Sequence, residues 1–474
     1  MLEFLKSVDD LVWGVPLIVL IIACGIWLTI QTGLLQVFHL GKALRFMVKN
    51  EDDGHGEVTS FGALCTALSA TIGTGNIVGV ASAICAGGPG ALFWMEVAAF
   101  FGMATKYAEG LLAVKYRCID PDGHVLGGPF YYIEKGMGRS WTWLAKCFAF
   151  LGALAGLMGI GTITQINGIT SAAQTFFDPN ASHVLFTIGD GDSSAVITVT
   201  TMVVGLLVTV LVALVVVGGI KRIAQVSEII VPFMSVLYVL CGLLILICNV
   251  TAIPGALYQI IVGAFNPRAV AGGVLGVTMR VAMQKGVARG IFSNEAGLGS
   301  APIAAAAAQT KEPVRQGLVT MTGTFIDTII ICTMTGLSIV ITGAWLPEHG
   351  LSGAQVTMFA FQNALPFPAG VCSFLLMLCL MFFAYTTILG WDYYSERCLE
   401  YLTGGNMGPV KVYRWLFIAA VFAGPYMTVE AVWTIADIFN GLMAIPNIIA
   451  LLALSGVVAA ETRSYFRRNA HLSL

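Results

Sequence analysis

The sequence predicts an all-α protein that crosses a membrane many times, and three observations support this. Of its 474 residues, 57% are hydrophobic and only 11% are charged, a balance that ordinary soluble domains do not show. The apolar residues gather in runs of about 20, the length that a helix needs to span a bilayer. Lysine and arginine collect in alternate loops between these runs. We therefore expect a single transmembrane domain over residues 1–474, embedded in a lipid bilayer.

Eleven spans can be placed along the chain. The expected spans cover residues 11–32, 60–86, 91–116, 143–176, 195–217, 224–250, 267–309, 318–345, 369–401, 412–427 and 429–460. The first lacks a basic leader and a convincing cleavage site, so we expect a retained helix rather than a signal peptide. The block 267–309 is irregular and glycine-rich, and it is counted once.

The distribution of charge predicts the orientation. With eleven spans the termini lie on opposite sides of the membrane. One set of loops and ends then holds most of the basic residues, among them Lys42, Arg117, Lys221, Arg315 and Arg467, while the other set is mainly acidic. Basic loops favour the cytoplasm. We expect an outside N-terminus and a cytoplasmic C-terminus in a plasma membrane, such as a bacterial inner membrane.

Composition also disfavours several function classes. The eleven cysteines are scattered without a CxxC pair, so we expect reduced small hydrophobes rather than disulfides or metal ligands. No HExxH, Walker or GxGxxG pattern has a supporting context, and no nucleophile–base constellation is seen, which disfavours a protease, an ATP-driven pump or another enzyme. We expect no cofactor and no nucleic-acid partner.

The second span carries the main functional signal. The run Ser69-Ala-Thr-Ile-Gly-Thr-Gly-Asn-Ile-Val-Gly-Val-Ala81 holds three glycines with Thr71, Thr74 and Asn76 among them. Each glycine weakens a helix by about 1 kcal/mol relative to alanine. Unwound backbone at membrane depth is tolerated where it lines a cavity, so a break here predicts a ligand site. Close helix packing through small residues is the alternative.

Without the first span, ten remain and divide into five and five. The first half, 60–250, opens with the glycine-broken segment, and the second, 267–460, opens with the irregular block in the opposite direction. This arrangement indicates an inverted-repeat secondary transporter. We expect the cluster Gly272–Gly276 to be the partner of the first break. The string Ser293–Pro302 predicts either a capped cytoplasmic re-entrant hairpin or a gating element.

Five strings resemble one known family. They are SATIGTGNIVGVA (69–81), AGGPGALFWM (86–95), GGPFYYIEKGMG (127–138), GVARGIFSNEAGLGSAPIAAAAA (286–308) and FAYTTILGWDYYSE (383–396). Together they closely resemble the alanine/glycine:cation symporter family over nearly the whole chain. The resemblance implies a leucine-transporter-like fold, a five-plus-five inverted repeat with one extra N-terminal helix. It also implies sodium-coupled, in some members proton-coupled, uptake of small neutral amino acids.

The break suits a zwitterionic amino acid. Between residues 58 and 97 only Glu96 is ionisable, so the substrate's carboxylate must be held by backbone N–H groups at a half-helix end, with a cation nearby. The carbonyls freed by the break, together with the side chains of Thr71 and Asn76, can bind the ammonium group or a cation through their oxygens. The expected substrate site comprises Thr71, Gly73, Thr74, Gly75 and Asn76.

A sodium site is expected beside the break. Phe383, Thr386 and Thr387 lie at i, i+3 and i+4 of one helix, so a carbonyl and two hydroxyls share a face. In the resembling fold a cation lies between the first and eighth core helices, which implies that the carbonyls of Ser69 and Ile72 complete the shell. The alternative is that both threonines hydrogen-bond back to their own helix.

Four further residues are candidates for the pocket. Gln165 contacts the substrate's polar end or joins helices as interhelical glue. Trp391 walls the pocket or anchors its helix at the cytoplasmic interface. Thr278 and Met279 follow the later glycine cluster and are expected to close the other side.

Carboxylates inside spans are functional candidates by default. Asp327, Glu109, Glu228 and Asp437 qualify by position, and Asp327 lies nearest the middle of a span. We expect Asp327 to couple a proton or a second cation. Glu109 and Glu228 are expected near cytoplasmic ends, within reach of Lys and Arg.

These expectations converge on sodium-coupled symport of alanine or glycine into the cell by alternating access. Small neutral amino acids, sodium and the bilayer are the expected partners. Proton coupling and a preference for serine or glutamine stay open, because the family that the chain resembles varies in these properties. A solute channel fits less well, since a break in each of two inverted halves favours alternating access.

Overall fold

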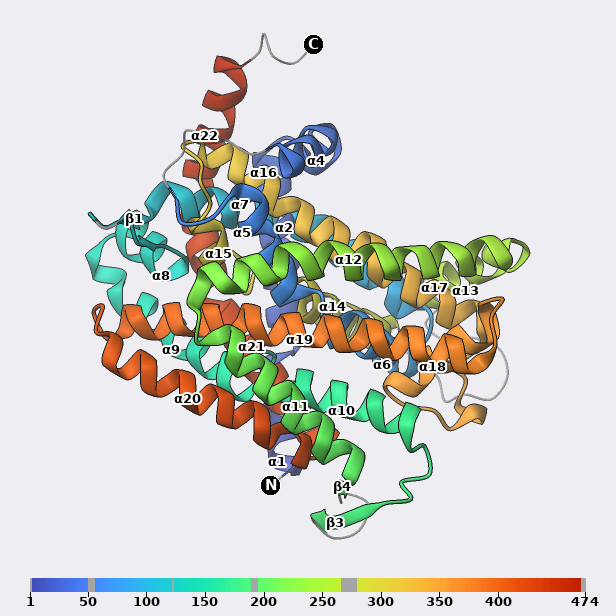
Figure 1. The fold of residues 1–474 in the computed structure, drawn as a ribbon. Coiled ribbons are helices and arrows are strands. Elements are labelled where there is room, and N and C mark those ends of the chain that lie inside the picture. The colour runs from blue at the N-terminus through green and yellow to red at the C-terminus, as the bar shows by residue number, and fades with distance from the viewer. Residues whose placement is uncertain (1, 50–55, 122, 189–194, 266–278, 470–474) are drawn as a thin grey trace.

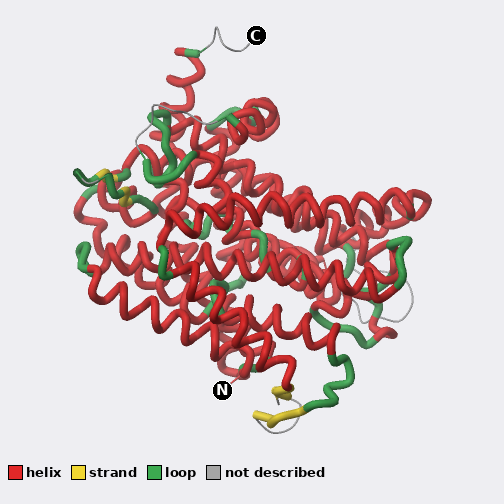
Figure 2. Tube along the Cα trace, in the orientation of Figure 1, coloured by secondary structure: helices red, strands yellow, loops and turns green. Residues whose placement is uncertain are grey.

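The computed structural model describes residues 2–49, 56–121, 123–188, 195–265 and 279–469 (Figure 1). Helices dominate, and two short hairpins lie at the edges (Figure 2). Strand β1 (Cys118–Ile119) pairs antiparallel with β2 (Val125–Leu126), and β3 (Val184–Ile188) pairs antiparallel with β4 (Ala195–Thr198). The predicted helical class is confirmed.

Long apolar helices make up most of the described chain. Eight are long and apolar enough to cross a membrane, or nine if one bent pair is a single span. The eight are α1–α2 (Leu2–Val12, Val15–Gln31), α7 (Gly90–Tyr116), α9–α10 (Thr142–Met158, Ile163–Phe177), α11 (Val199–Val216), α12 (Gly219–Cys248), α16–η6–α17 (Pro313–Thr324, Phe325–Cys332, Thr333–Thr342), α19 (Ala369–Leu402) and α21 (Val429–Ala453). The bent pair is α5 (Ser60–Thr71) and α6 (Val78–Gly87).

The count of eleven stays a prediction. Helix α20 (Met407–Ala423) has only 17 residues. The block 267–309 is described only from α14 (Met279–Asn294) and α15 (Ala301–Ala306) onward, so Thr278 and the cluster Gly272–Gly276 lie outside the described residues. An apolar helix that the sequence analysis did not assign, α13 (Ile253–Phe265), lies between the fifth and sixth repeat spans.

The glycine-rich second span is broken where the sequence predicts. Helix α5 begins at Ser60, where the Thr59 hydroxyl accepts from the Gly62 N–H, a normal N-cap. It ends at Thr71, a single 3-10 turn, η1 (Thr74–Asn76), follows, and α6 leaves at 60° to α5.

A second break separates α14 from α15. Between them Glu295, Gly297 and Gly299 have φ of +56°, +89° and +81°, the left-handed region that glycine tolerates and other residues seldom adopt. The chain therefore unwinds within the string 293–302, where the sequence predicts a hairpin or a gating element.

Both breaks are enclosed by other helices. Helix α7 is buried continuously from Gly102 to Val114 and packs along α14 and α16. Helix α5 lies against α12 and α19, and α6 lies against α14 and α7. Because protein surrounds them, unwound backbone groups find partners that the lipid would not provide.

The ends of the described chain lie far apart. Helix α1 and helix α22 (Ser455–Arg468) occupy opposite ends of the molecule in Figure 1. Beside α22 lies α4 (Leu40–Val48), which follows the short α3 (Leu35–Phe38). Opposite ends agree with an odd number of spans, although the side of the membrane on which each lies stays a prediction.

Candidate functional site

Asn76 closes the unwound turn and ties it to another helix. Its Oδ1 accepts from the Gly73 N–H at 2.9 Å. Its Nδ2 donates to Asp327 Oδ1 at 2.7 Å and to the Asp327 carbonyl at 3.1 Å. Both side chains are fully buried. Asp327 lies in η6, a π-helical stretch of the kind that often marks functional sites.

Asp327 also receives hydrogen bonds from two other segments. Its Oδ2 accepts from Ser293 Oγ at 2.9 Å and from Thr328 Oγ1 at 2.8 Å. Ser293 belongs to the last turn of α14 and packs against Gly75, where a Cβ would lie 3.2 Å from the Ser293 Cα. The first break, the end of α14 and η6 therefore meet at one buried carboxylate.

Gln165 links the first break to a third irregular segment. The Thr74 N–H donates to Gln165 Oε1 at 3.0 Å, and Gln165 Nε2 donates to the Ile160 carbonyl at 2.9 Å. Ile160 lies between α9 and α10, so the expected span 143–176 is two helices. In this structure Gln165 makes the interhelical link that was one of its two predicted roles.

On α19, Thr387 faces the first break. Its Oγ1 lies 3.2 Å from the Ile72 carbonyl oxygen and 3.0 Å from that of Phe383. A Cβ on Gly73 would approach Thr387 Oγ1 to 2.6 Å, so only glycine fits there. Three of the oxygens predicted for a sodium shell are thus gathered at the end of α5.

Further hydroxyls near the break also bond within their own helices, as Thr387 does to the Phe383 carbonyl one turn earlier. Thr386 Oγ1 is 3.0 Å from the Phe382 carbonyl and 3.6 Å from Met234 Sδ of α12. Ser69 Oγ donates to the Thr66 carbonyl at 2.7 Å, and Thr71 Oγ1 to that of Ala67 at 3.2 Å. For these three side chains the structure shows the back-bonded arrangement.

Trp391 joins α19 to the second break. Its indole Nε1 donates to Glu295 Oε1 at 2.7 Å, and Ser300 Oγ donates to Glu295 Oε2 at 2.5 Å. Trp391 is 1% exposed, which does not fit an anchor at the membrane interface. A Cβ on Gly161 would lie 2.6 Å from the Trp391 Cβ, so the indole fills the space beside the break between α9 and α10.

Glu109 completes the second break from α7. Its Oε1 accepts from the N–H groups of Gly297 and Gly299 at 3.1 and 3.2 Å and from Asn447 Nδ2 at 2.7 Å. Glu109 is fully buried and holds unwound backbone, and its expected place near a cytoplasmic end stays a prediction. Glu228 accepts from Thr59 Oγ1 at 3.2 Å beside the start of α5.

Lys106 accompanies these carboxylates, one turn before Glu109. It is buried, and its charge acts on Glu109, Glu295 and Asp327. Lys106 is not among the predicted site residues, whereas Ser293 and Glu295 belong to the string 293–302, which is predicted to be a capped hairpin or a gating element. The signal for Lys106 is its place three residues before Glu109 inside the expected span 91–116, because intramembrane charge is rarely idle.

A cavity reaches the first break from the side of α6. It measures ≈ 350 Å³, and Thr74, Val78 and Gly168 are among its lining residues. Arg289 and Trp433 line it as well. The Arg289 guanidinium pairs with both Asp437 oxygens at 2.7 Å and lies 4.9 Å from the Trp433 ring centroid, so this pair is reinforced by a cation–π contact.

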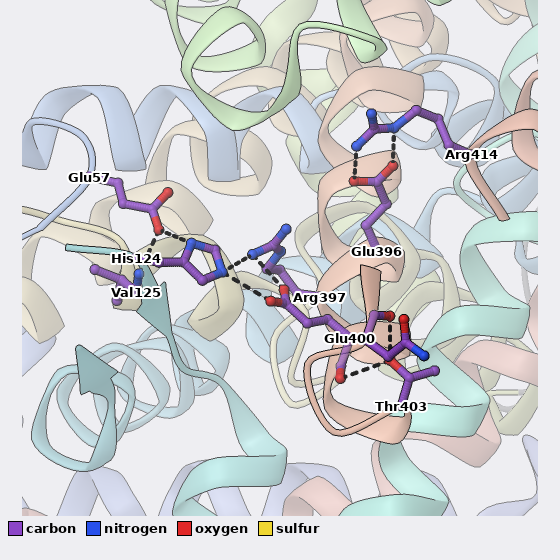
Figure 3. Close-up of polar contacts among 9 residues, drawn as sticks. Glu57, His124, Val125, Glu396, Arg397, Glu400, Thr403 and Arg414 are labelled. Atoms are coloured by element: carbon purple, nitrogen blue, oxygen red, sulfur yellow. Dashed lines mark hydrogen bonds and ion pairs between the residues drawn. The ribbon is translucent and has the colours of Figure 1, made fainter. Parts of the chain in front are cut away.

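A cluster of charged side chains lies on the other side of the first break from this cavity, next to the segment that precedes α5. Figure 3 shows His124 of the β1–β2 hairpin between Glu57 and the α19 pair Glu400 and Arg397. His124 Nδ1 lies 2.8 Å from Glu57 Oε1, and its Nε2 lies 3.0 Å from Glu400 Oε1. Arg397 Nη1 is 2.6 Å from Glu400 Oε2 and 2.7 Å from His124 Nε2.

The protonation of His124 decides which of these bonds form. Hydrogen bonds to Glu400 and Glu57 raise the pKa of His124 to about 9, against burial and the Arg397 charge. The charged imidazole donates to both carboxylates. A neutral ring that keeps its proton on Nδ1 would instead accept from Arg397 at Nε2. Burial would raise the pKa of Glu57, but hydrogen bonds from His124 and the Val125 N–H hold it below its usual range.

Backbone pairing closes the same side. The Glu57 N–H donates to the Ala307 carbonyl at 2.9 Å, and the Gln309 N–H donates to the Val58 carbonyl at 2.8 Å. Arg117 bridges the carbonyls of Ala306 and Ala308 at 2.7 Å each. The segments that flank the two broken helices on this side are therefore held together.

Met279 lies away from this cluster. It begins α14, whereas Ser293, near the end of that helix, touches the first break. Fourteen residues of α-helix correspond to roughly 21 Å. Among the predicted pocket residues, the structure brings together the first break, Gln165, Thr387 and Asp327.

Comparison with known proteins gives a family. The sodium:alanine symporter family matches residues 1–473. A transporter of Haemophilus influenzae, uncharacterised by its name, is 52% identical over 98% of this chain and 96% of its own. A sodium/alanine symporter of Methanococcus maripaludis is 44% identical over 98% and 97%. A probable sodium/glutamine symporter of Bacillus subtilis is 35% identical over 97% and 90%.

Proposed function

We propose that this chain, which belongs to the sodium:alanine symporter family and is a transporter rather than an enzyme, carries a small neutral amino acid such as alanine or glycine together with sodium. The observation that supports it most is that Asp327 joins the first break, through Asn76, to the end of α14 just before the second break, through Ser293. Two discontinuous helices inside a bundle provide free amides, carbonyls and half-helix ends for a zwitterion and a hard cation.

The substrate's carboxylate would bind at the Gly73 and Thr74 amides. Both N–H groups now donate to side-chain oxygens, those of Asn76 and Gln165. A carboxylate is a stronger acceptor than a neutral amide oxygen, so it would replace them and leave the two side chains to hold its flanks. Because Thr74 lines the ≈ 350 Å³ cavity, the substrate would enter through that cavity.

Sodium would bind where Thr387 meets the carbonyls of Ile72 and Phe383. These oxygens already lie within 3.2 Å of Thr387 Oγ1. Hard cations take such neutral oxygen ligands. The Ser69 carbonyl would add a ligand from α5, and Thr386 would join by turning its hydroxyl away from Met234.

Asp327 would couple a second charge to the break. It is a buried carboxylate one hydrogen bond from Asn76, and such a group in a membrane bundle needs a compensating proton or cation. The substrate's ammonium group, a second cation or a proton can supply that compensation in turn. This keeps proton coupling as the alternative to purely sodium-driven transport.

Uptake by the reconstituted protein tests the proposal. Proteoliposomes with an inward sodium gradient should accumulate labelled alanine above its equilibrium level, and collapsing the gradient should release it. Flux that never exceeds equilibrium would identify a channel instead. Competition by unlabelled glycine, serine and glutamine ranks the substrates, and a proton gradient imposed without sodium distinguishes the coupling ions.

A further inference from the structure

A basic pocket lies beside the end of α2, where α22 leaves the helical bundle. It measures ≈ 470 Å³, and its lining includes Thr32, His39, Thr462, Arg463, Phe466 and Arg467. It lies away from the helix breaks, and the transport cycle proposed above does not use it. We propose that this pocket binds the phosphate headgroup of an anionic phospholipid from the cytoplasmic leaflet.

Among the residues that the structure describes, no acidic side chain neutralises the two arginines of the pocket. Arg463 and Arg467 are exposed, and within the described part of the chain neither has an acidic partner. Arg463 Nε donates to the Ala459 carbonyl at 3.2 Å, which leaves its terminal nitrogens for a ligand. By contrast Arg468, the next residue along, pairs with Glu312 at 3.5 Å. Two guanidinium groups without counter-ions favour a phosphate, whose oxygens match their donor geometry.

Aromatic rings form the wall behind these cations. The His39 ring stacks on Phe466 at 4.1 Å and 15°, and Lys42 Nζ lies 5.3 Å from the centre of the Phe466 ring. Burial, and then the charge of Lys42, lower the pKa of His39, so it is neutral at pH 7 and can donate or accept a hydrogen bond. A third cation is thus held next to the pocket by packing rather than by an acid.

Apolar side chains beside the pocket indicate a lipid rather than a soluble anion. The turn after α2 runs through Gly33 and Leu34, with φ of +70° and +56°, and redirects the chain into α3 and α4. It leaves Leu34, Val37 and Phe38 44%, 54% and 71% exposed. A surface with cations on one side and bulky apolar groups on the other fits the boundary between headgroups and acyl chains.

The position along α2 fits the same boundary. Thr32 follows directly on Gln31, the last residue of that apolar helix. Basic pockets beside the cytoplasmic ends of membrane helices suit anionic headgroups. The proposal relies on the predicted cytoplasmic C-terminus, because anionic lipid is the ligand expected there, and it does not rely on the identity of the transported amino acid.

The test is lipid binding by the purified full-length protein. Native mass spectrometry would count bound phosphatidylglycerol and phosphatidylcholine in the wild type, in Arg463→Gln/Arg467→Gln and in Lys221→Gln/Lys411→Gln. The last variant is the matched control, since it removes two exposed charges near the starts of α12 and α20, also on the predicted cytoplasmic side. We expect about tenfold weaker phosphatidylglycerol binding in the arginine variant and wild-type binding in the control.

Two further arms make the result decisive. Phosphatidylglycerol should raise the midpoint of thermal unfolding of the wild type and of the control but not of the arginine variant, whose lipid-free midpoint should match theirs. Equal binding of phosphatidylcholine, equal binding by the arginine variant, or displacement of the lipid by millimolar inorganic phosphate would each overturn the proposal. Because none of these readouts uses transport, a failure here is separate from a failure of the proposed symport.

Discussion

The two sides of the helix breaks differ in what covers them. On the side of α6 a cavity of ≈ 350 Å³ extends to Thr74, and one ion pair, Arg289–Asp437, stands in its wall. On the side of the β1–β2 hairpin, backbone pairing around Val58 and the cluster centred on His124 tie the flanks of both broken helices together. The structure is therefore open to the first side and closed to the second.

For a transporter that works by alternating access, as we propose, this difference indicates which contacts would have to change. Opening the hairpin side requires breaking several bonds at once, whereas closing the α6 side requires only that groups around the cavity approach. A ligand shifts such an equilibrium only through its different affinity for the two states. If the proposed symport is right, the affinity of the sites for substrate and sodium must differ between the state with these hairpin-side contacts and the state without them.

The largest loss of uptake is expected on substitution of Asp327, the carboxylate at the first break between the two sides. Asp327→Ala leaves the donors Asn76, Ser293 and Thr328 buried without their acceptor, at a cost of about 1–3 kcal/mol for each unsatisfied group. We expect uptake of labelled alanine by proteoliposomes to fall more than about tenfold. Asp327→Asn is the control that keeps shape and one acceptor oxygen; full uptake by the alanine variant would remove Asp327 from the mechanism.

Substitution of the two threonines of α19, Thr386 and Thr387, should affect the sodium dependence of uptake very differently. Thr387→Ala removes the hydroxyl that lies between the carbonyls of Ile72 and Phe383, whereas Thr386→Ala removes one that faces Met234. We expect the sodium concentration for half-maximal uptake to rise about tenfold for Thr387→Ala, equivalent to about 1.4 kcal/mol, and distinctly less for Thr386→Ala. Equal shifts in the two variants would show that both hydroxyls bind the ion.

Raising the pH should weaken the contacts of His124 that help to close the side of the β1–β2 hairpin. The pKa of His124 is raised to about 9, above its unfolded value, so its bonds to Glu57 and Glu400 stabilise closure fully below about pH 6.5. That stabilisation is lost as the pH rises through about 9. Hydrogen exchange at the Glu57 and Gln309 amides, corrected for intrinsic rates, should become less protected over this interval.

His124→Gln is the matched variant for this pH series. It cannot titrate, so we expect a flat protection profile at the low level that the wild type reaches above pH 9. A profile in the variant that still falls between pH 6.5 and 9 would assign the titration to another group. The effect should be a few-fold, since the ring is 29% exposed and solvent weakens its ion pairs.

Part of this arrangement is readable in the sequence. Glycine density places the first break correctly, because a helix weakened at three nearby positions has few other options inside a bundle. The same criterion points to Gly272–Gly276 for the second break. That cluster lies outside the described residues, and its prediction stays untested. Within the described chain a second break lies between Glu295 and Ser300, where Glu109 of another helix accepts the freed N–H groups. A hydrogen bond between residues as far apart in the chain as Glu109 and Gly297 leaves no local sequence pattern that would predict it.

The sodium site proposed beside Thr387 shows a similar limit at the level of one helix. Helical spacing puts Thr386 and Thr387 near Phe383, yet neighbouring residues point about 100° apart. Only one can face the Ile72 carbonyl, and the packing of α12 against α19 decides that Thr386 turns to Met234. Likewise the sequence marks Asp327 by its depth in a span, but its bond to Asn76 depends on how residues 251 positions apart pack together.

The smallest effect on transport is expected for substitutions beside the cavity on the side of α6. Arg289→Lys keeps the positive charge but loses the two-pronged pairing with Asp437 and most of the contact with the Trp433 face. Because Arg289 lines the cavity and does not touch the ion site proposed beside Thr387, we expect the KM for alanine to rise about two- to fivefold, equivalent to about 0.4–1 kcal/mol, with the sodium dependence unchanged. Asp437→Asn, which breaks the pair from the other partner, should reproduce the shift. A change in sodium affinity in either variant would instead connect this wall of the cavity to the ion site beside Thr387, and the two sides would then be less independent than their geometry indicates.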